Sequence, residues 1–310
     1  MSLPGFGRLH QEADALRSPV PLAVAGGADP TVLEALRVAT DRGWVEPIVV
    51  GSGAEIRRVA DENSVDLDGF SIRDVADVAN QAVAAVLEVR EGRAAMLMKG
   101  QIATPALMQA VLDPGHGIRS GRVACQVVLM EIADDGRRFL MADTGVCVRP
   151  KLASKVEIVR HAIAAARSLG EGRPRVALMA ATEAVDVTMP ETVDAAEIRR
   201  RGRDGEFPGA PVEGPLSFDL AYSADAGGKK RAGGEVVGAA DAMVFPDLLS
   251  ANLTVKAIMY TADCHFGGVL RGTTVPVAFM SRADTAATRL NSLALALAIL
   301  RHEEASGSAV

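Results

Sequence analysis

The sequence is poor in aromatic residues, which make up 4% of its 310 residues and include one Trp and two Tyr. Folds that stack nucleic-acid bases need aromatic faces on the binding surface. Sustained binding of a phosphate backbone needs a basic face, whereas the net charge here is −6. These features argue against a nucleic-acid partner. Any anionic ligand must therefore be bound by a local group of Arg or Lys side chains.

Cysteine is also scarce, with Cys125, Cys147 and Cys264 standing far apart and forming no CxxC pair. Three scattered cysteines favour a reducing compartment over a disulfide framework or a structural zinc site. The five histidines share no close spacing and no HExxH motif occurs, so we expect no metal. The longest apolar run, residues 293–300, is too short to span a bilayer, and no signal peptide is evident. We expect a cytoplasmic protein without a membrane partner.

Short apolar runs alternate with stretches of helical periodicity along most of the chain. This alternation predicts an α/β protein with parallel strands and helices on both sheet faces. Strands are expected at 22–25, 47–50, 95–98, 123–130, 139–142, 176–179, 242–245 and 275–280. Helices are expected at 32–38, 75–89, 156–169 and 284–303. Residues 190–234 break the pattern with an Arg-rich run, then three prolines and several glycines, which predicts an exposed loop.

Polar residues follow several of the expected strands, at the end where open α/β sheets bind ligands. Lys99 follows the strand at 95–98, where it is either a solvated side chain or a ligand contact. Arg119 lies in a Gly/Pro-rich loop and either pairs with a phosphate or faces water. The Gly26-Gly27 turn enters a helix but lacks the spacings of a Rossmann or P-loop motif, which favours a plain structural turn.

Two later segments have the composition of a polar ligand site. Asn252 and Lys256 stand on an expected helix that follows the strand at 242–245, in either a ligand site or a capped connection. Ser281-Arg282 ends the strand at 275–280, with Asp284 leading into the last helix. A hydroxyl and a guanidinium at a helix start form a phosphate cradle, although a simple capping arrangement uses the same residues.

Eight short stretches, taken in order, resemble the phosphate acetyltransferase / phosphate butyryltransferase family from about residue 21 to 300. They are Leu97–Gly100, Gly117–Arg119, Met141–Val146, Gly214–Asp219, Val237–Asp241, Val244–Asp247, Asn252-Leu253 with Lys256, and Ser281–Asp284. The acetyltransferases have an acidic residue seven positions after the Ser of the Ser-Arg pair. Thr288 stands there in this chain, as in the butyryltransferase branch.

The resemblance implies two α/β domains with a central cleft, in an isocitrate/isopropylmalate-dehydrogenase-like architecture. The first domain would comprise residues 1–124 and 269–310, with the second inserted as residues 125–268. It also implies an acyltransferase that exchanges a short acyl group, such as acetyl or butyryl, between CoA and inorganic phosphate. Acyl-CoA and phosphate or acyl phosphate would be its ligands, with no separate cofactor. A homodimer is expected, and the apolar helix at residues 293–300 would be either core or shared with a second copy.

The resemblance implies a role for each matching residue. Arg282 and Ser281 would bind the phosphate, while Asn252 and Lys256 would stabilise the tetrahedral intermediate. The substrate-binding residues would be Arg119, Lys99, Lys230 and Asp284, the last as a helix cap, as an orienting partner of Arg282 or in thiol deprotonation. Three departures from the family pattern bear on specificity, at Ala251, Cys125-Gln126 and Gly234. The alternative is a non-catalytic acyl-CoA-sensing module of the same fold.

Overall fold

Two groups of elements organise the chain in the computed structural model, which describes residues 2–307. The terminal unit comprises residues Phe6–Arg122 together with the chain from Phe266 onward. The inserted unit comprises residues Val123–His265 and takes in the N-terminal segment up to Gly5. The divisions therefore lie a few residues from the expected ones. The segment before Phe6 joins the inserted unit because the Leu3 carbonyl accepts a hydrogen bond from Arg138.

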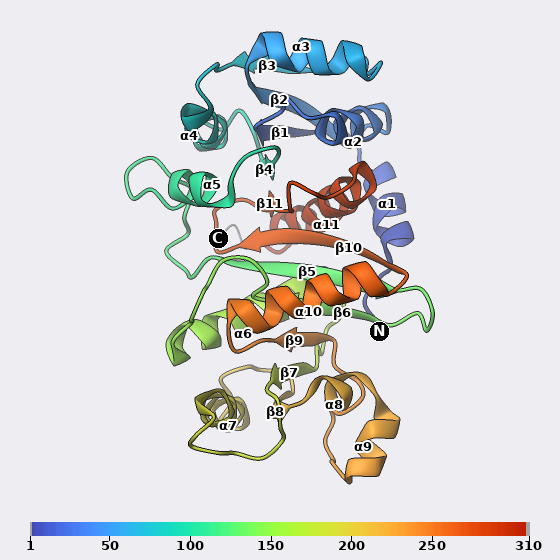
Figure 1. Cartoon of the computed structure of the whole chain (residues 1–310), viewed down its shortest axis with the longest axis vertical. Coiled ribbons are helices and arrows are strands. Elements are labelled where there is room, and N and C mark those ends of the chain that lie inside the picture. The colour runs from blue at the N-terminus through green and yellow to red at the C-terminus, as the bar shows by residue number, and fades with distance from the viewer. Residues whose placement is uncertain (1, 308–310) are drawn as a thin grey trace. The chain divides into compact units, whose positions relative to one another are not determined.

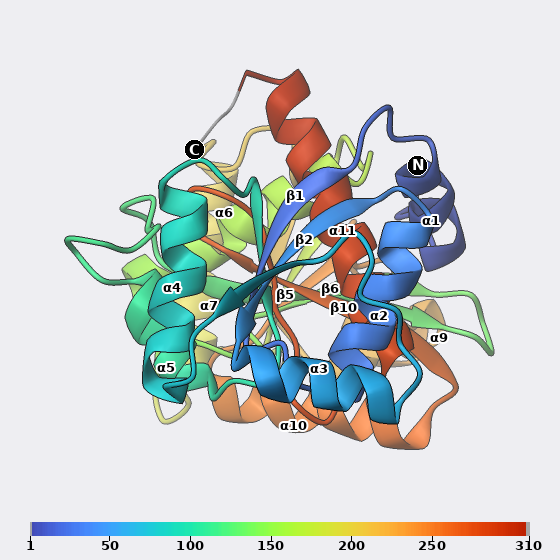
Figure 2. The same ribbon diagram turned by 90° about the horizontal axis from the view of Figure 1, so that it is seen from above.

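The terminal unit is built on strands in the order β3-β2-β1-β4-β11-β10. These strands are parallel except at β10–β11, which is antiparallel. Figures 1 and 2 show α2 and α4 on opposite sides of β1 and β2. The elements are α1 (Phe6–Asp14), β1 (Val20–Ala25), α2 (Pro30–Asp41), β2 (Val45–Gly51), α3 (Gly53–Glu62), β3 (Ser71–Asp74), α4 (Val78–Arg90), β4 (Met96–Lys99), α5 (Thr104–Val111), β10 (Cys264–Arg271), β11 (Val277–Ala278) and α11 (Ala286–Ala305).

The inserted unit has the strand order β5-β6-β9-β7-β8. Its β5–β6 pair is antiparallel and the remaining pairs are parallel. The elements are β5 (Cys125–Ile132), β6 (Arg138–Ala142), α6 (Leu152–Ser168), β7 (Val176–Met179), α7 (Pro190–Arg203), β8 (Val212–Leu216), α8 (Phe218–Tyr222), α9 (Ala224–Lys230), β9 (Ala242–Val244) and α10 (Leu248–Thr261). The α/β class predicted from the sequence is confirmed.

Every expected strand overlaps an observed one, whereas β3, β8 and β10 were not expected. Strand β3 has mostly exposed residues and no apolar alternation. Strand β10 contains Gly267, where a Cβ would lie 2.9 Å from the backbone of Asn291. The glycine therefore lets α11 approach the strand closely.

The prediction of an exposed loop at 190–234 is wrong, because this segment forms α7, β8, α8 and α9. Its Arg-rich run belongs to α7, where Arg200 pairs with Glu197 and Asp204, and Arg201 pairs with Glu197. Such pairs at helical spacing support a polar helix.

The apolar helix α11 lies in the core of the terminal unit, where it packs on α1, α2 and β11. Leu293, Leu295, Leu297 and Ile299 are all buried within this single chain. Two settings were expected for this helix, the core or an interface with a second copy. Burial in the core accounts for all four of these side chains. Among the described residues, no helix combines the length and apolar character needed to cross a bilayer.

Candidate active site

Two loops meet at the carboxyl end of the parallel strands in the terminal unit. Gly26 begins the β1–α2 turn with φ of +77°, a left-handed conformation that favours glycine. Gly100 follows β4, and a Cβ there would lie 2.2 Å from the Gly26 carbonyl oxygen. The Gly100 N–H donates to the Ala25 carbonyl at 2.9 Å, and the Gln101 N–H donates to the Gly26 carbonyl at 2.7 Å. These contacts fix the end of β4 beside the start of α2.

Helix α2 begins at an aspartate that also contacts the last helix of the chain. Asp29 caps the helix, because its Oδ1 accepts from the Val32 N–H at 3.1 Å and from the Thr31 hydroxyl at 2.6 Å. Arg289 of α11 donates from Nε to Thr31 Oγ1 at 2.9 Å. Its Nη2 lies 3.9 Å from Asp29 Oδ1. The structural turn predicted at Gly26-Gly27 thus leads into a charged network.

Sequence reasoning missed Arg289, whose side chain is 0% exposed. Its Nη2 also donates to the Arg282 carbonyl at 3.5 Å, whereas its Nη1 is buried without a hydrogen-bond partner among the described residues. Burial lowers the pKa of Arg289, while Asp29 and Asp284 oppose that shift. The signal in the sequence is a lone guanidinium four residues before the apolar run of α11.

Lys99 is buried at the end of β4 with 1% of its surface exposed, so its interpretation as a solvated side chain is wrong. Within residues 2–307 it makes no hydrogen bond or ion pair. Burial, together with the charges of Arg289 and Arg282, lowers the pKa of Lys99 to about 8, and the charge of Asp284 opposes this shift. The structure therefore places Lys99 in the same charged cluster as Arg282, Asp284 and Arg289.

The loop from Ser281 to Asp284 connects β11 to α11. Asp284 Oδ2 accepts from the Ser281 N–H at 2.8 Å, and Ser281 Oγ accepts from the Ala283 N–H at 3.3 Å. The helix cap is Thr285, whose Oγ1 accepts from the Thr288 N–H at 3.2 Å. Capping of α11 by Asp284 is therefore wrong, since this carboxylate closes the loop. The Ser281 and Arg282 residues are exposed and available to a ligand.

Arg119 also lies in the terminal unit, in the segment that follows α5. Its backbone forms an isolated antiparallel bridge with Thr273, and the residue is exposed. The Thr274 N–H donates to the neighbouring Ile118 carbonyl at 2.8 Å. The loop is thus held to the β10–β11 connection while the guanidinium faces solvent.

In the inserted unit, Asp143 organises the loop after β6. Its Oδ1 accepts from the N–H groups of Gln126, Gly145 and Val146, and its Oδ2 accepts from that of Cys147. The carboxylate is buried and saturated by backbone donors. Its function is to fix the fold of this loop.

Asn252 lies in the first turns of α10 and donates from Nδ2 to the Thr144 carbonyl at 3.1 Å. Asp247 caps that helix by accepting from the Ser250 N–H at 2.8 Å. The Thr144 hydroxyl is buried and has no hydrogen-bond partner among the described residues. Sequence reasoning matched Thr144 to a motif but did not assign it a role. The structure thus brings Asn252 and Thr144 together at the start of α10.

The remaining two candidate lysines differ in their surroundings. Lys256 follows Asn252 by one helical turn and is exposed. Lys230 Nζ lies 2.9 Å from Asp219 Oδ2 and donates to Ser217 Oγ at 3.2 Å. The hydrogen bond from Lys230 to Asp219 raises the pKa of that lysine. The ammonium group of Lys230 is therefore held in contact with the Ser217–Asp219 motif.

The departures from the family pattern also have definite positions. Ala251 is 0% exposed, so its methyl lies in the packing of α10. Gln126 supplies a backbone donor to Asp143, and Cys125 is buried. Gly234 has φ of +140°, and a Cβ there would lie 2.2 Å from Glu213 Oε2. Glycine at this position therefore suits a positive φ and leaves room for the Glu213 carboxylate, and a serine would be strained there.

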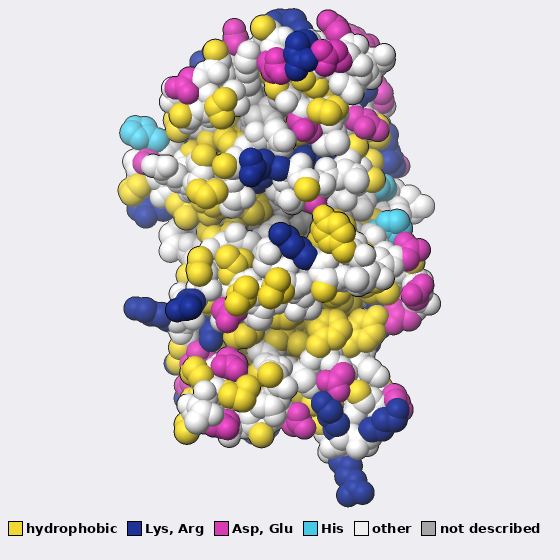
Figure 3. All heavy atoms as spheres, in the orientation of Figure 1, with side chains coloured by type: hydrophobic (Ala, Val, Ile, Leu, Met, Phe, Trp, Pro, Cys, Tyr) yellow, Lys and Arg dark blue, Asp and Glu magenta, His cyan; other side chains and the backbone are white. Residues whose placement is uncertain are grey.

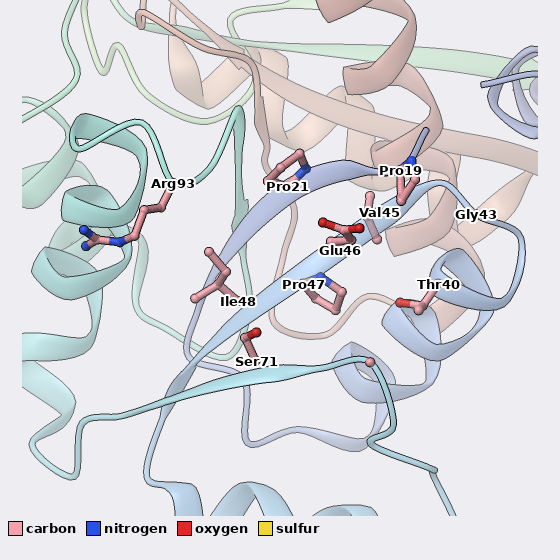
Figure 4. Close-up of a pocket in the computed structure, with 11 residues that line it drawn as sticks. Pro19, Pro21, Thr40, Gly43, Val45, Glu46, Pro47, Ile48, Ser71 and Arg93 are labelled. Atoms are coloured by element: carbon pink, nitrogen blue, oxygen red, sulfur yellow. The ribbon is translucent and has the colours of Figure 1, made fainter. Parts of the chain in front are cut away.

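A cavity of about 480 Å³ in the terminal unit lies away from the candidate residues. It is lined by the first residues of β1, β2 and β3, including Pro21, Val45 and Ser71, with Arg93 at its side (Figure 4). Those are the amino ends of parallel strands, whereas ligands of open α/β sheets bind at the carboxyl ends. In the described part of the chain, no group of three or more His, Cys, Asp or Glu residues is arranged to bind a metal ion.

Comparison with known proteins identifies this arrangement. Residues 75–297 match the family model described as phosphate acetyl/butaryl transferase. A phosphate butyryltransferase of Clostridium acetobutylicum is 36% identical over 275 residues, which cover 89% of this chain and 91% of that protein. A crystal structure of a branched-chain phosphotransacylase from Enterococcus faecalis has a TM-score of 0.81 at 30% identity, covering 91% of this chain and 99% of that one.

A 4-hydroxythreonine-4-phosphate dehydrogenase from Klebsiella pneumoniae shows how widely the fold is shared. It has a TM-score of 0.53 at 13% identity and covers 91% of this chain and 100% of that one. This likeness concerns the fold alone and agrees with the dehydrogenase-like architecture implied by the motifs.

The fold and the matched motifs define a phosphate acyltransferase. The chain belongs to the phosphate acetyl/butyryl transferase family, which confirms the resemblance drawn from the eight motifs.

Proposed function

We propose that this chain catalyses the reversible reaction of a short-chain acyl-CoA with phosphate to give an acyl phosphate and CoA. A phosphate oxygen attacks the thioester carbonyl carbon and forms a C–O bond. The carbonyl oxygen carries negative charge in the tetrahedral intermediate until the C–S bond breaks. The released CoA thiolate then takes up, through solvent, the proton that the hydrogen phosphate loses on becoming acyl phosphate. The site must orient two anionic substrates and stabilise the intermediate.

The observation that carries this proposal is the charged cluster beside the Ser281–Asp284 loop. Arg282 presents an exposed guanidinium, the donor geometry suited to a phosphate, and Ser281 adds a hydroxyl. Asp284 accepts from the Ser281 N–H and so positions the loop. Arg119 is assigned as a second anchor for phosphate or CoA, since its side chain is exposed on a backbone held to Thr273.

Residues of α10 are assigned to the acyl carbonyl. The Asn252 amide would donate to the developing oxyanion, and Lys256 would supply positive charge one turn further along. The hydrogen bond from Asn252 to the Thr144 carbonyl supports this role, because it orients the amide before substrate arrives. Lys230 would act through the Ser217–Asp219 motif that it contacts. No metal takes part in this reaction scheme.

Acetyl, butyryl and branched acyl groups remain alternative substrates, because a single methylene changes pocket affinity by only about 1–3 kcal/mol. Thr288 favours the butyryl type. Its buried hydroxyl lies 3.2 Å from Thr285 Oγ1 in the first turn of α11, where the acetyltransferases have an acidic residue.

A thiol-release assay tests the proposal directly. Purified protein is mixed with acetyl-, propionyl-, butyryl- or isobutyryl-CoA, and free CoA is measured with and without phosphate. We expect phosphate-dependent release that is fastest with a four-carbon acyl group. Binding of acyl-CoA without phosphate-dependent release would contradict catalysis and favour the acyl-CoA-sensing alternative.

We also infer a homodimer in the cytoplasm. The exposed residues Leu249, Leu253 and Tyr260 form an apolar stripe along α10, and hydrophobic side chains gather over this helix in Figure 3. A stripe of this kind is typical of an interaction surface. Cys125, Cys147 and Cys264 form no disulfide, which suits a reducing compartment. Light scattering should give a mass about twice 32.3 kDa, and a fully active monomer would contradict the dimer.

A further inference from the structure

The terminal unit buries two positively charged side chains that lack sufficient partners. Lys99 is 1% exposed and makes no hydrogen bond or ion pair within residues 2–307. Arg289 is 0% exposed, and its Nη1 has no acceptor among these residues. A buried cation without an acceptor is costly, because it has lost its hydration without replacement. Within the described chain, Arg289 has acceptors for Nε and Nη2 only, and its charge also repels that of Lys99.

The carboxylates around the pair do not balance its charge. Asp29 lies 3.9 Å from Arg289 Nη2 and is already bonded to the Thr31 hydroxyl and the Val32 N–H. Asp284 accepts from the Ser281 N–H in the β11–α11 loop. With Arg282, the cluster contains three cations and two carboxylates, and both carboxylates already have other donors.

The position of the loop gives the pair a route to a ligand. Arg289 Nη2 donates to the Arg282 carbonyl, so the backbone of the exposed Ser281–Arg282 loop lies directly against the buried guanidinium. Lys99 joins the same cluster from the end of β4, which Gly100 holds beside the β1–α2 turn. An anion that binds at Ser281-Arg282 therefore lies next to the cluster that contains the unused donors of Lys99 and Arg289.

We propose that Lys99 Nζ and Arg289 Nη1 bind a phosphoryl group beside the Ser281–Arg282 loop, as the inner part of the phosphate site. This inference rests on the proposed function for its ligand. Acyl-CoA and acyl phosphate have no free carboxylate, so phosphoryl oxygens are the anionic groups that these substrates offer. The group belongs either to inorganic phosphate and acyl phosphate or to CoA, and the experiment separates these sources.

Binding is measured without turnover, by thermal unfolding and calorimetry. Wild type and Lys99→Met are compared in phosphate-free buffer, with inorganic phosphate, and with CoA, each at constant ionic strength. We expect inorganic phosphate to raise the Tm of the wild type and to leave the Tm of Lys99→Met unchanged. In phosphate-free buffer Lys99→Met should have the higher Tm, since it removes an uncompensated buried charge.

Lys155→Met is the matched control. Lys155 is also largely buried, with a side chain 11% exposed, but its Nζ lies 2.7 Å from Asp194 Oδ2. Its replacement leaves that carboxylate unpaired, so we expect a lower Tm and an intact response to phosphate. Arg289→Lys serves as a second variant that keeps the buried charge and removes the Nη1 donor, and it should weaken phosphate binding.

Steady-state kinetics supply the readout that a merely structural lysine would not move. Lys99→Met should raise the KM for phosphate about ten- to a hundred-fold, as expected for the loss of a charged hydrogen bond. The KM for acyl-CoA should change less than about twofold. If CoA but not phosphate stabilises the protein through Lys99, the phosphoryl group is that of CoA.

The outcomes separate this inference from the proposed function. Binding of phosphate that depends on Lys99, in a protein that releases no CoA from any acyl-CoA, would support the site and contradict the acyltransferase activity. An active enzyme whose Lys99→Met and Arg289→Lys variants bind phosphate and CoA as the wild type does would overturn the site alone.

Discussion

The lysines of the two units differ in their surroundings, and the difference separates two uses of positive charge. Lys99 in the terminal unit is buried and unpartnered within the described residues. In the inserted unit, Lys230 is paired with Asp219, and Lys256 faces solvent. An exposed or paired lysine costs the folded protein little stability when no ligand is bound. A buried unpaired lysine destabilises the ligand-free protein. The comparison supports the proposal that Lys99 contacts an anionic ligand, whereas Lys230 has a carboxylate partner within the protein.

The carboxylates show the same contrast. Asp143 in the inserted unit is saturated by backbone N–H donors from its own loop and from β5. Asp29 and Asp284 in the terminal unit are shared between local backbone or hydroxyl donors and the neighbouring cations. The charge of Asp143 is therefore compensated within its own loop, whereas the cluster around Lys99, Arg282 and Arg289 contains more cations than carboxylates.

Asp143→Ala should produce the largest loss of stability. The substitution leaves buried N–H groups of the β6–α6 loop without acceptors, and each costs about 1–3 kcal/mol. We expect an unfolding free energy lower by about 3 kcal/mol or more, measured by denaturant titration, with the same loss in the presence of phosphate. A variant as stable as the wild type would contradict the role of Asp143 in fixing the fold of this loop.

Arg282→Ala should affect activity and leave folding intact, because the guanidinium is exposed. Loss of one charged contact to phosphate should raise the activation free energy by about 1.5–3 kcal/mol. The value of kcat/KM should therefore fall roughly ten- to a hundred-fold. Kinetics at several phosphate concentrations, with circular dichroism as the folding control, provide the measurement. Near-normal kcat/KM would refute the assignment of the phosphate site to Ser281-Arg282.

The stability of the phosphate-free protein should depend on pH through Lys99. Its pKa falls from 10.5 in the unfolded chain to about 8 in the folded protein, so the folded protein releases this proton first as pH rises. The destabilising contribution is complete below pH 8 and disappears as pH approaches 10.5, with a size on the order of 3 kcal/mol. Wild type should gain stability relative to Lys99→Met across this window. Parallel pH profiles for the two proteins would contradict the unpaired state of Lys99.

Lys256→Ala should have the smallest effect on stability, within about 0.5 kcal/mol, because an exposed side chain loses little on truncation. Its kcat should nevertheless fall if this lysine supplies charge to the intermediate. Chemical denaturation and saturation kinetics on the same preparation separate the two effects. An unchanged kcat would contradict the assignment of Lys256 to stabilisation of the intermediate.

The sequence predicted most of the strands but not the burial of the charges at their ends. Strand β4 follows from its apolar run, and the position of Lys99 at its carboxyl end follows from that strand. Its burial results from the meeting of β4, the β1–α2 turn and α11, which are far apart in the chain. No local pattern reports such a meeting. Arg289 was missed for the same reason, since its partners Asp29 and Thr31 lie near the other end of the sequence.

The inserted unit shows the opposite limit of sequence reasoning. Its α7 is stabilised by ion pairs between residues three or four positions apart. The composition of this segment had predicted a loop. The Asn252 contact with Thr144 joins two motifs that were each recognised separately. Motif matching therefore found the residues, and the fold supplied their partners.

The most direct test is an NMR titration of the Lys99 ammonium group. Protein labelled at lysine ¹³Cε is titrated with and without phosphate, and comparison with Lys99→Met assigns the resonance among the six lysines. We expect a pKa of about 8 for Lys99 in phosphate-free buffer and a clear increase when phosphate binds. A pKa near 10.5 in both conditions would show that the lysine is neither desolvated nor in contact with a phosphoryl group.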